Sequence, residues 1–339
     1  MVQIYENPWR RRGLDWEGLR DIPWPSVDAE AVGRLLTRCP LHDETPLTRL
    51  DGLAGAGSVL VKDERWRMGL GSFKALGAAY VIARDHAAGT SKGCTYVTAS
   101  AGNHGLSVAA GAVAFGAKAV VYLSEAVPEE FAERLRTYEA QVVREGATYE
   151  DSMAAAAQAA KDNDWALLSD SSWPGYLDRP YRVMEGYLAM ADEVVRQIET
   201  PPSHVFLQAG VGGLAGACAA YFRAKWGDAP RIIVVEPDAA PALADSIKAG
   251  RAVVSQGPVS SMGRLDCKEP SLIALKGLAR EADAFALISE DEAARAMPHL
   301  SEVGLDTTPS GGAGLAALLA MAPLGPDARV LCILSEAPE

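Results

Sequence analysis

Short apolar runs rich in β-branched residues recur along this chain, and a longer helical pattern follows most of them. The clearest are SVLVK at residues 58–62, AVVYL at 119–123, RIIVVE at 231–236 and VLCIL at 330–334. Strands that are apolar throughout are typical of parallel sheets with helices covering both faces. The sequence therefore predicts an α/β fold with parallel-rich sheets.

The same patterns place the other expected elements. Further strands are predicted at residues 95–98, 166–169, 204–208 and 284–288, and helices at 72–86, 103–115, 129–140, 149–163 and 181–198. A chain of 339 residues is long for a single core, so two domains are expected.

Charge and cysteine usage exclude several classes of protein. With 32 basic and 44 acidic residues the net charge is −12, which argues against a nucleic-acid or anionic-membrane partner. The five cysteines form no CxxC pair, so we expect reduced thiols, no disulfide and no metal site. Neither a secretory signal nor a long apolar run is present, which predicts a cytoplasmic protein without a membrane span.

A glycine-rich turn in QAGVGGLAGACA, residues 208–219, joins a predicted strand to a predicted helix. Glycines allow a ligand to approach the backbone closely, and a helix N-terminus attracts an anion. A phosphate group is therefore the expected ligand. A plain tight turn without a ligand is the alternative.

The same turn also fits a different class of enzyme. The spacing of Gly210, Gly212 and Ala215 matches the dinucleotide fingerprint, and Glu236 ends the next strand where a ribose-binding acid would stand. A nicotinamide-dependent oxidoreductase is therefore an alternative, although it leaves the stretch GSFKAL at residues 71–76 unexplained.

A second turn, TASAGNHG at residues 98–105, lies between a predicted strand and a predicted helix. Its backbone N–H groups, together with the side chains of Ser100 and Asn103, suit a carboxylate ligand. His104 is either a catalytic base or a packing residue.

Three single residues stand at similar junctions. Lys74 begins an apolar helix after a glycine turn, Asp170 follows a strand in LLSDSSWPGY, and Ser335 follows the last strand. A surface position is the simplest role for such a lysine, and helix capping for such an aspartate. Ligands of α/β proteins bind at the carboxyl ends of strands, which favours a functional role for Asp170.

Taken together, SFK, SAGNHG, GVGGLAG and the final serine resemble the fold-type II pyridoxal-phosphate enzymes, the tryptophan-synthase-β superfamily. Within it the chain is most similar to diaminopropionate ammonia-lyases, and then to threonine and serine dehydratases. The resemblance runs from about residue 65 to the C-terminus. It implies a large domain of residues 1–79 and 187–339, a small domain of residues 80–186, and a cofactor in the cleft between them.

The resemblance also implies roles for residues that would hold pyridoxal 5'-phosphate. Lys74 would form the Schiff base, and burial would lower the pKa of its amine. Phe73 would flank the ring, Asn103 would bond its phenolic oxygen, and Ser335 would face its nitrogen. The phosphate would lie on Gly210, Val211, Gly212, Gly213 and Leu214.

On the substrate side, the resemblance implies that the amino acid's carboxylate lies on Ser100, Ala101, Gly102, Asn103 and His104. Lys74 and Asp170 would be the catalytic residues. A hydroxyl such as Ser335 cannot keep the ring nitrogen protonated as a carboxylate would, which favours β-elimination over transamination.

The expected enzyme is therefore a lyase that converts a small β-amino or β-hydroxy amino acid into a 2-oxo acid and ammonia. The ammonia-lyases carry an acid where this chain has Ala101, which raises β-hydroxy substrates such as threonine, serine or 3-hydroxyaspartate as the alternative. Arg264 and Lys268, in MGRLDCKEPS, would suit an anionic side chain, unless they are simply exposed to solvent. The resemblance also suggests a homodimer.

Overall fold

A computed structural model describes residues 2–338 and contains a large sheet with the strand order β1-β10-β9-β8-β11-β3-β2. Its five central strands run parallel, whereas the edge strands β1 and β2 are antiparallel to their neighbours. The strands are β1 (Gln3–Glu6), β2 (Leu47–Leu50), β3 (Ser58–Asp63), β8 (His204–Gln208), β9 (Arg231–Pro237), β10 (Ala284–Ile288) and β11 (Arg329–Leu334).

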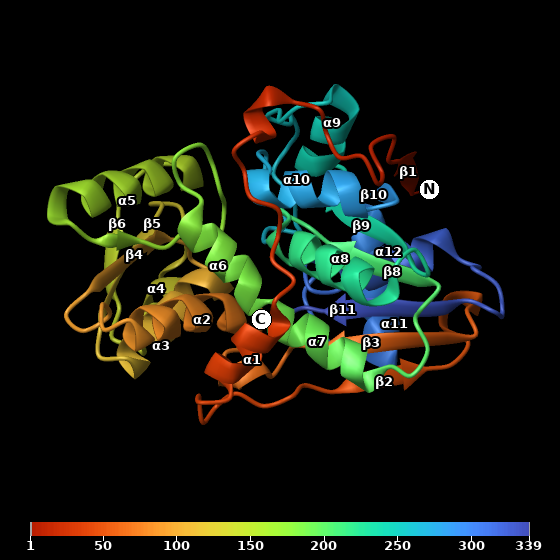
Figure 1. Cartoon of the computed structure of the whole chain (residues 1–339), viewed down its shortest axis with the longest axis horizontal. Coiled ribbons are helices and arrows are strands. Elements are labelled where there is room, and N and C mark those ends of the chain that lie inside the picture. The colour runs from red at the N-terminus through yellow and green to blue at the C-terminus, as the bar shows by residue number, and fades with distance from the viewer. Residues whose placement is uncertain (1, 339) are drawn as a thin grey trace.

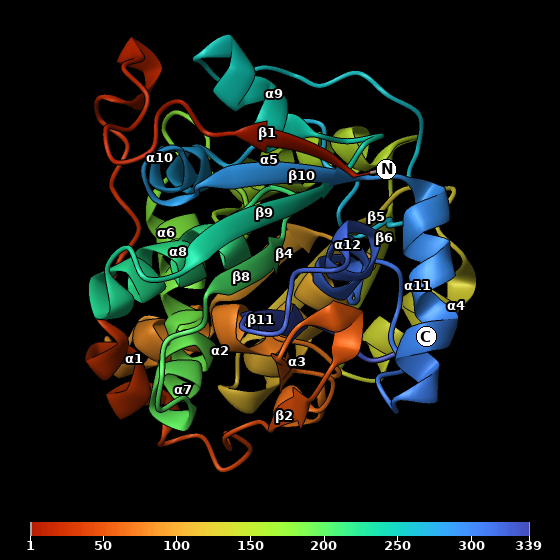
Figure 2. The ribbon, with the colours of Figure 1, turned by 90° about the vertical axis from the view of Figure 1, so that its right-hand side faces the viewer.

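Helices cover both faces of this sheet, as its continuously apolar strands require. Figure 2 shows α11 (Glu290–Glu302) and α12 (Ala313–Met321) on one side. The other side carries α7 (Leu188–Gln197), α8 (Gly213–Trp226) and α10 (Leu272–Glu281). Helix α9 (Ala242–Ala249) packs on β9 and α10.

A second, parallel sheet has the order β6-β5-β4-β7 and forms the separate lobe on the left of Figure 1. Helix α5 covers one of its faces, and α3 and α4 cover the other. Helix α2 packs against α3, and α1 packs against both α2 and α7. The bounds are α1 (Ala29–Leu36), α2 (Lys74–Ala87), β4 (Thr95–Ala99), α3 (Asn103–Ala114), β5 (Lys118–Leu123), α4 (Glu129–Arg136), β6 (Gln141–Arg144), α5 (Tyr149–Asn163) and β7 (Ala166–Leu167).

The four strands of this lobe lie within residues 95–167, inside the small domain that we propose for residues 80–186. The proposed boundary at residue 80 falls inside α2, which spans residues 74–87. This helix packs against both α3 and α6 (Asp178–Gly186). In the described residues, no helix is long and apolar enough to span a membrane.

The prediction of one long helix over residues 181–198 is wrong, because the chain forms two helices, α6 and α7, that meet at Tyr187. Helix α2 crosses α6 so closely at Gly186 that a Cβ atom there would lie 2.5 Å from the carbonyl oxygen of Leu76. The close crossing therefore requires glycine at the point where α6 ends.

Beneath the segment that leads to Lys74 lies a buried network of two cations and two carboxylates. Arg67 donates to Glu64 at 2.7 Å and to Glu193 at 2.6 Å, and all three side chains are at most 3% exposed. Lys62 Nζ lies 2.6 Å from Glu193 and donates to the carbonyl oxygen of Thr45. Because Glu193 belongs to α7, the network fixes the segment before Lys74 to the large domain.

Replacing Arg67 with methionine is expected to lower the free energy of unfolding by about 3–5 kcal/mol, because two buried carboxylates lose their main counter-charge. The measurement is urea denaturation. The control is Arg49→Met, which removes an exposed pair with Asp51 and is expected to change stability by less than about 0.5 kcal/mol. Equal losses in both variants would contradict the stabilising role of the network.

Candidate active site

The predicted site residues follow the carboxyl ends of strands from both sheets. Ser100 follows β4, Asp170 follows β7 closely, residues 209–212 follow β8, and Ser335 follows β11. Ligands of α/β proteins bind at such ends. Lys74 reaches the same region because it is the first residue of α2.

The start of α2 is held by the segment after the last strand. The Phe73 N–H donates to the Ser335 carbonyl at 3.1 Å, and the Ala337 N–H donates to the Gly71 carbonyl at 2.9 Å. Between these bonds, Ser72 and Glu336 form an antiparallel bridge. Residues 71–73 and 335–337 are therefore paired through an isolated antiparallel bridge, and this pairing fixes the direction in which Lys74 leaves the backbone.

Asp170 is fixed by the turn that follows it. The Tyr176 hydroxyl accepts from the Ser169 N–H at 3.0 Å and donates to the Leu167 carbonyl at 2.9 Å. The Trp173 ring stacks on the Tyr176 ring, with centroids 4.4 Å apart. These contacts give the WPGY stretch a structural role, which is to close the loop that presents the carboxylate.

The same loop is attached to the large domain. The hydroxyls of Ser172 and Ser271 share a hydrogen bond of 2.7 Å, and the Ile273 N–H donates to Ser172. Because Ser271 and Ile273 lie at the start of α10, Asp170 is positioned by both lobes.

Lys74 Nζ donates directly to the Asp170 carboxylate, and the two side chains are 23% and 17% exposed. Burial disfavours the charge on Lys74, but Asp170 outweighs burial and raises the pKa of the amine. Burial likewise opposes the charge on Asp170, but the adjacent ammonium of Lys74 lowers the pKa of the carboxyl. The expectation that burial would lower the pKa of Lys74 is therefore wrong in this arrangement.

His104 lies close to this pair and is buried. Its Nε2 atom lies 2.8 Å from the Leu168 carbonyl oxygen, a contact that requires a proton on Nε2. Burial lowers the pKa of His104, so the ring is neutral at pH 7. Its Nδ1 atom has no hydrogen-bond partner among the described residues and is therefore an acceptor.

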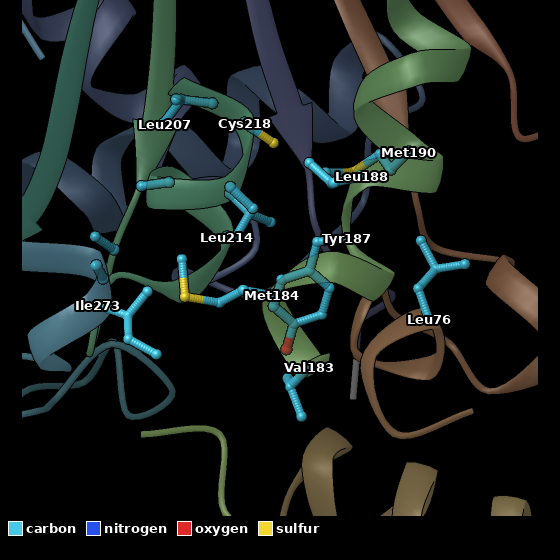
Figure 3. Close-up of a cluster of buried hydrophobic side chains, with 14 of the residues drawn as sticks. Leu76, Val183, Met184, Tyr187, Leu188, Met190, Leu207, Leu214, Cys218 and Ile273 are labelled. Atoms are coloured by element: carbon cyan, nitrogen blue, oxygen red, sulfur yellow. The ribbon is translucent and has the colours of Figure 1, made fainter. Parts of the chain in front are cut away.

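Tyr187, which the sequence did not single out, lies between α2 and α8. A Cβ atom on Gly77 would be 2.8 Å from the Tyr187 ring, and one on Gly213 would be 3.6 Å from it. Figure 3 shows the ring within an apolar cluster that includes Leu76 and Leu214. Burial raises the pKa of Tyr187 to about 12, although the nearby charge of Lys74 opposes this. The phenol is therefore a proton donor, and its oxygen has no partner within the described chain.

Phe73 borders the same space. Its ring centroid lies 5.4 Å from Lys74 Nζ, and its ring packs edge-on against Tyr187 with centroids 4.9 Å apart. An aromatic face therefore stands next to the amine.

The glycine turn has the form expected of a phosphate site. Gly212 has φ +96°, which favours glycine, and α8 begins at Gly213 with the unpaired N–H groups of its first turn. Gly210 has an additional role, because a Cβ atom there would lie 2.9 Å from Cys267 Sγ. This glycine therefore also makes room for the loop that carries Arg264 and Cys267.

The loop predicted to bind a carboxylate, with Ser100, Ala101 and Gly102, is half-buried and leads into α3. Asn103 Nδ2 donates to the buried Glu336 carboxylate at 2.5 Å. Glu336 also accepts from the Thr308 hydroxyl and pairs with Arg264. Ser335 is buried beside it, and its N–H donates to the Gly311 carbonyl at 3.2 Å.

A phosphorylated aldehyde fits these residues. The glycine turn and the start of α8 provide an anion site, Lys74 provides an amine, and Phe73 provides an aromatic neighbour. Two buried polar atoms, His104 Nδ1 and the Tyr187 hydroxyl oxygen, have no partner within the described chain, as expected where a polar ligand completes a site.

The structure argues against the nicotinamide-dependent oxidoreductase, because Glu236, the acid that would bind the ribose, has other partners. Glu236 is fully buried and accepts from the N–H groups of Leu243 and Ala244, both at 2.8 Å. Its carboxylate therefore serves the start of α9 rather than a ribose.

Sequence reasoning missed Tyr187 and Glu336 as members of the site. For Glu336 the available signal was its position directly after Ser335, and for Tyr187 it was the glycine at position 186, inside a predicted helix. Among the described residues, no cluster of His, Cys, Asp or Glu side chains is arranged to hold a metal ion. Two surface cavities, of about 430 and 450 Å³, are lined by other residues.

Comparison with known proteins identifies the family of this chain. The model of the family described as "Pyridoxal-phosphate dependent enzyme" matches residues 39–336. The diaminopropionate ammonia-lyase of Salmonella typhimurium is 34% identical over 286 residues, which cover 76% of this chain and 70% of the relative. An L-threonine ammonia-lyase of Geobacter sulfurreducens is 29% identical over 78% of this chain and 63% of its own length.

Among solved structures, this fold resembles the Escherichia coli diaminopropionate ammonia-lyase in complex with an aminoacrylate-PLP azomethine reaction intermediate. The TM-score is 0.88 at 29% identity, and the match covers 99% of this chain and 94% of that one. The predicted α/β architecture is thereby confirmed. The family match and the likeness to this solved structure lead to one conclusion: the chain belongs to the pyridoxal-phosphate dependent enzymes, and within them to fold type II.

Proposed function

We propose that this protein is a lyase that removes the β-substituent of a small 2-amino acid and releases a 2-oxo acid and ammonia. The ion pair of Lys74 with Asp170 carries the proposal, because it brings an amine and a carboxylate together. Tyr187 lies between this pair and the glycine turn, since its ring packs against Phe73 and would lie 3.6 Å from a Cβ atom on Gly213. The ammonia-lyases similar to this chain support the same reaction class.

Pyridoxal phosphate, when bound, supplies an aldehyde that combines with amines and a ring that withdraws electrons from the α-carbon. The chain's own residues would hold it as follows. Lys74 provides the amine, Gly210–Leu214 the phosphate donors, Phe73 and Asn103 the neighbours of the ring, and Ser335 a hydroxyl for its nitrogen.

The substrate carboxylate lies on residues 100–104, next to the start of α3. One member of the Lys74–Asp170 pair, in its deprotonated form, takes the α-proton of the substrate, and a protonated group gives a proton to the departing β-substituent. His104 remains neutral, so it adds no charge to the Lys74–Asp170 pair beside it. Water then hydrolyses the unsaturated amine product to a 2-oxo acid and ammonia.

The decisive measurement is release of 2-oxo acid from a panel of β-amino and β-hydroxy amino acids in both configurations. We expect turnover of at least one member of the panel, with one ammonia released for each 2-oxo acid from a β-hydroxy substrate and two from a β-amino substrate, whose departing group is itself ammonia. Ala101 predicts a preference for one configuration, because the acid that the ammonia-lyases carry at this position is absent here. If no member of the panel releases a 2-oxo acid, the proposed function is wrong.

We also propose that the enzyme works as a homodimer in the cytoplasm. The support is the family resemblance together with cysteines that are free throughout the described chain. Sedimentation of the purified holoenzyme measures whether it is a dimer.

A further inference from the structure

One arginine lies between the two loops of the site. Arg264 belongs to the connection between α9 and α10, and its carbonyl oxygen would be 3.1 Å from a Cβ atom on Gly210. Its Nε atom would be 3.6 Å from a Cβ atom on Gly102. Arg264 therefore borders both the phosphate turn and the loop assigned to the substrate carboxylate.

The guanidinium of Arg264 is held in place by a buried carboxylate. Its Nε atom lies 3.1 Å from one oxygen of Glu336, and a terminal nitrogen donates to the other oxygen at 3.2 Å. Glu336 is itself fixed by Asn103 and Thr308. One hydrogen bond and the ion pair with this buried carboxylate therefore hold Arg264 at the edge of the site.

The charges around this arginine favour one class of substrate. Of the carboxylates described within the site, Asp170 is committed to Lys74 and Glu336 to Arg264. Residue 101 is alanine, so the loop at Gly102 brings no acid for a second ammonium group. A second anionic group, in contrast, meets a partly desolvated guanidinium, which bonds carboxylates more strongly than neutral donors do.

We propose that Arg264 is a specificity-determining residue and that the substrate is a β-substituted amino acid with a second carboxylate, such as 3-hydroxyaspartate. This inference rests on the proposed function. The α-proton and the β-hydroxyl leave as water, and hydrolysis of the resulting enamine consumes one water. The net products are 2-oxosuccinic acid and ammonia.

Lys268, the other cation of this loop, has a different role. Its amine donates to the carbonyl oxygens of Ala239 and Pro258, both at 2.8 Å, and pairs with Asp266. It anchors the loop. From the sequence, both cations would suit an anionic side chain unless they are simply exposed to solvent, and the proposal keeps the first role for Arg264 alone.

Binding is tested first, without turnover. Calorimetry on the holoenzyme is expected to show succinate, a dicarboxylate, binding about 100-fold more tightly than butyrate, a monocarboxylate. Arg264→Met should remove this difference. Arg251→Met, which removes an exposed arginine from the same connection, should preserve it. Because Arg264→Met leaves Glu336 without its arginine, the double variant R264M/E336Q is measured as well and should behave like R264M.

Kinetics then separate this inference from the proposed function. For wild type, kcat/KM for 3-hydroxyaspartate should exceed that for serine by about 100-fold, and Arg264→Met should lose this factor mainly through KM. Serine or 2,3-diaminopropionate as the better substrate would overturn the inference and leave the proposed function standing. An equal loss on serine would also overturn it, because Arg264 would then bind the α-carboxylate. If no amino acid releases a 2-oxo acid, the proposed function itself fails.

Discussion

Replacing Lys74 with alanine is expected to abolish both turnover and the yellow absorbance of the purified holoenzyme. Lys74 is the amine at the start of α2 that stands against Asp170 and beside the Phe73 ring. Removing a covalent nucleophile lowers kcat by roughly 10⁶-fold in well-studied hydrolases, and a loss of similar size is expected here. The measurements are the visible spectrum and the release of 2-oxo acid.

Two further variants identify the cause of such a loss. Lys74→Arg keeps the positive charge beside Asp170 but removes the nucleophilic amine, so it should preserve the fold and still be inactive. Lys92→Ala removes an exposed lysine and should retain full activity. Turnover by the alanine variant at a rate near that of wild type would exclude Lys74 as the anchor of the cofactor.

Replacing Asp170 with asparagine is expected to slow elimination by roughly 10²–10⁴-fold while the cofactor stays bound, which is the usual contribution of a general acid or base. The amide keeps the shape of the side chain but cannot exchange a proton near neutral pH. Steady-state kinetics with the best substrate of the panel measure the rate, and the visible spectrum measures cofactor occupancy.

The same substitution has a pH signature. Asp170 raises the pKa of Lys74, so without this carboxylate only burial remains as the main influence and the pKa of the amine falls. Lys74 of the variant apoprotein therefore loses its proton at lower pH, and the pH dependence of its reaction with pyridoxal shifts in the acidic direction. Ser171→Ala, at the adjacent residue, is the control. An unchanged rate and an unchanged pH profile would show that Asp170 is only structural.

Much of the fold could be predicted because its central strands are buried on both faces. Strands β8 and β10 have the bounds that the apolar pattern predicted, His204–Gln208 and Ala284–Ile288. The edge strands β1 and β2 were not predicted, because most of their residues are exposed or half-buried and leave no continuous apolar run. Their pairing depends on neighbours that are distant in sequence.

Site residues could be predicted only where the local sequence itself indicates a particular backbone conformation, such as a turn or the start of a helix. The glycine turn at Gly212 and the helix starts at Lys74 and Asn103 are features of this kind. Glu336 is different, because an acid near the end of a chain suggests an exposed position. Its burial arises from Asn103, which is 233 residues away, and from Arg264, which is 72 residues away. Such contacts exist only once both sheets are in place.

The pairing of residues 71–73 with residues 335–337 has a consequence for biosynthesis. On a ribosome the first segment emerges long before the second, and until the second follows, α2 lacks the backbone partners that orient its first residue. Strand β11 lies between β8 and β3 and comes directly before this second segment, so the large sheet is also joined late, whereas the four strands of the second sheet come earlier in the chain. The backbone bonds that orient Lys74 therefore form only once residues 335–337 are available for pairing.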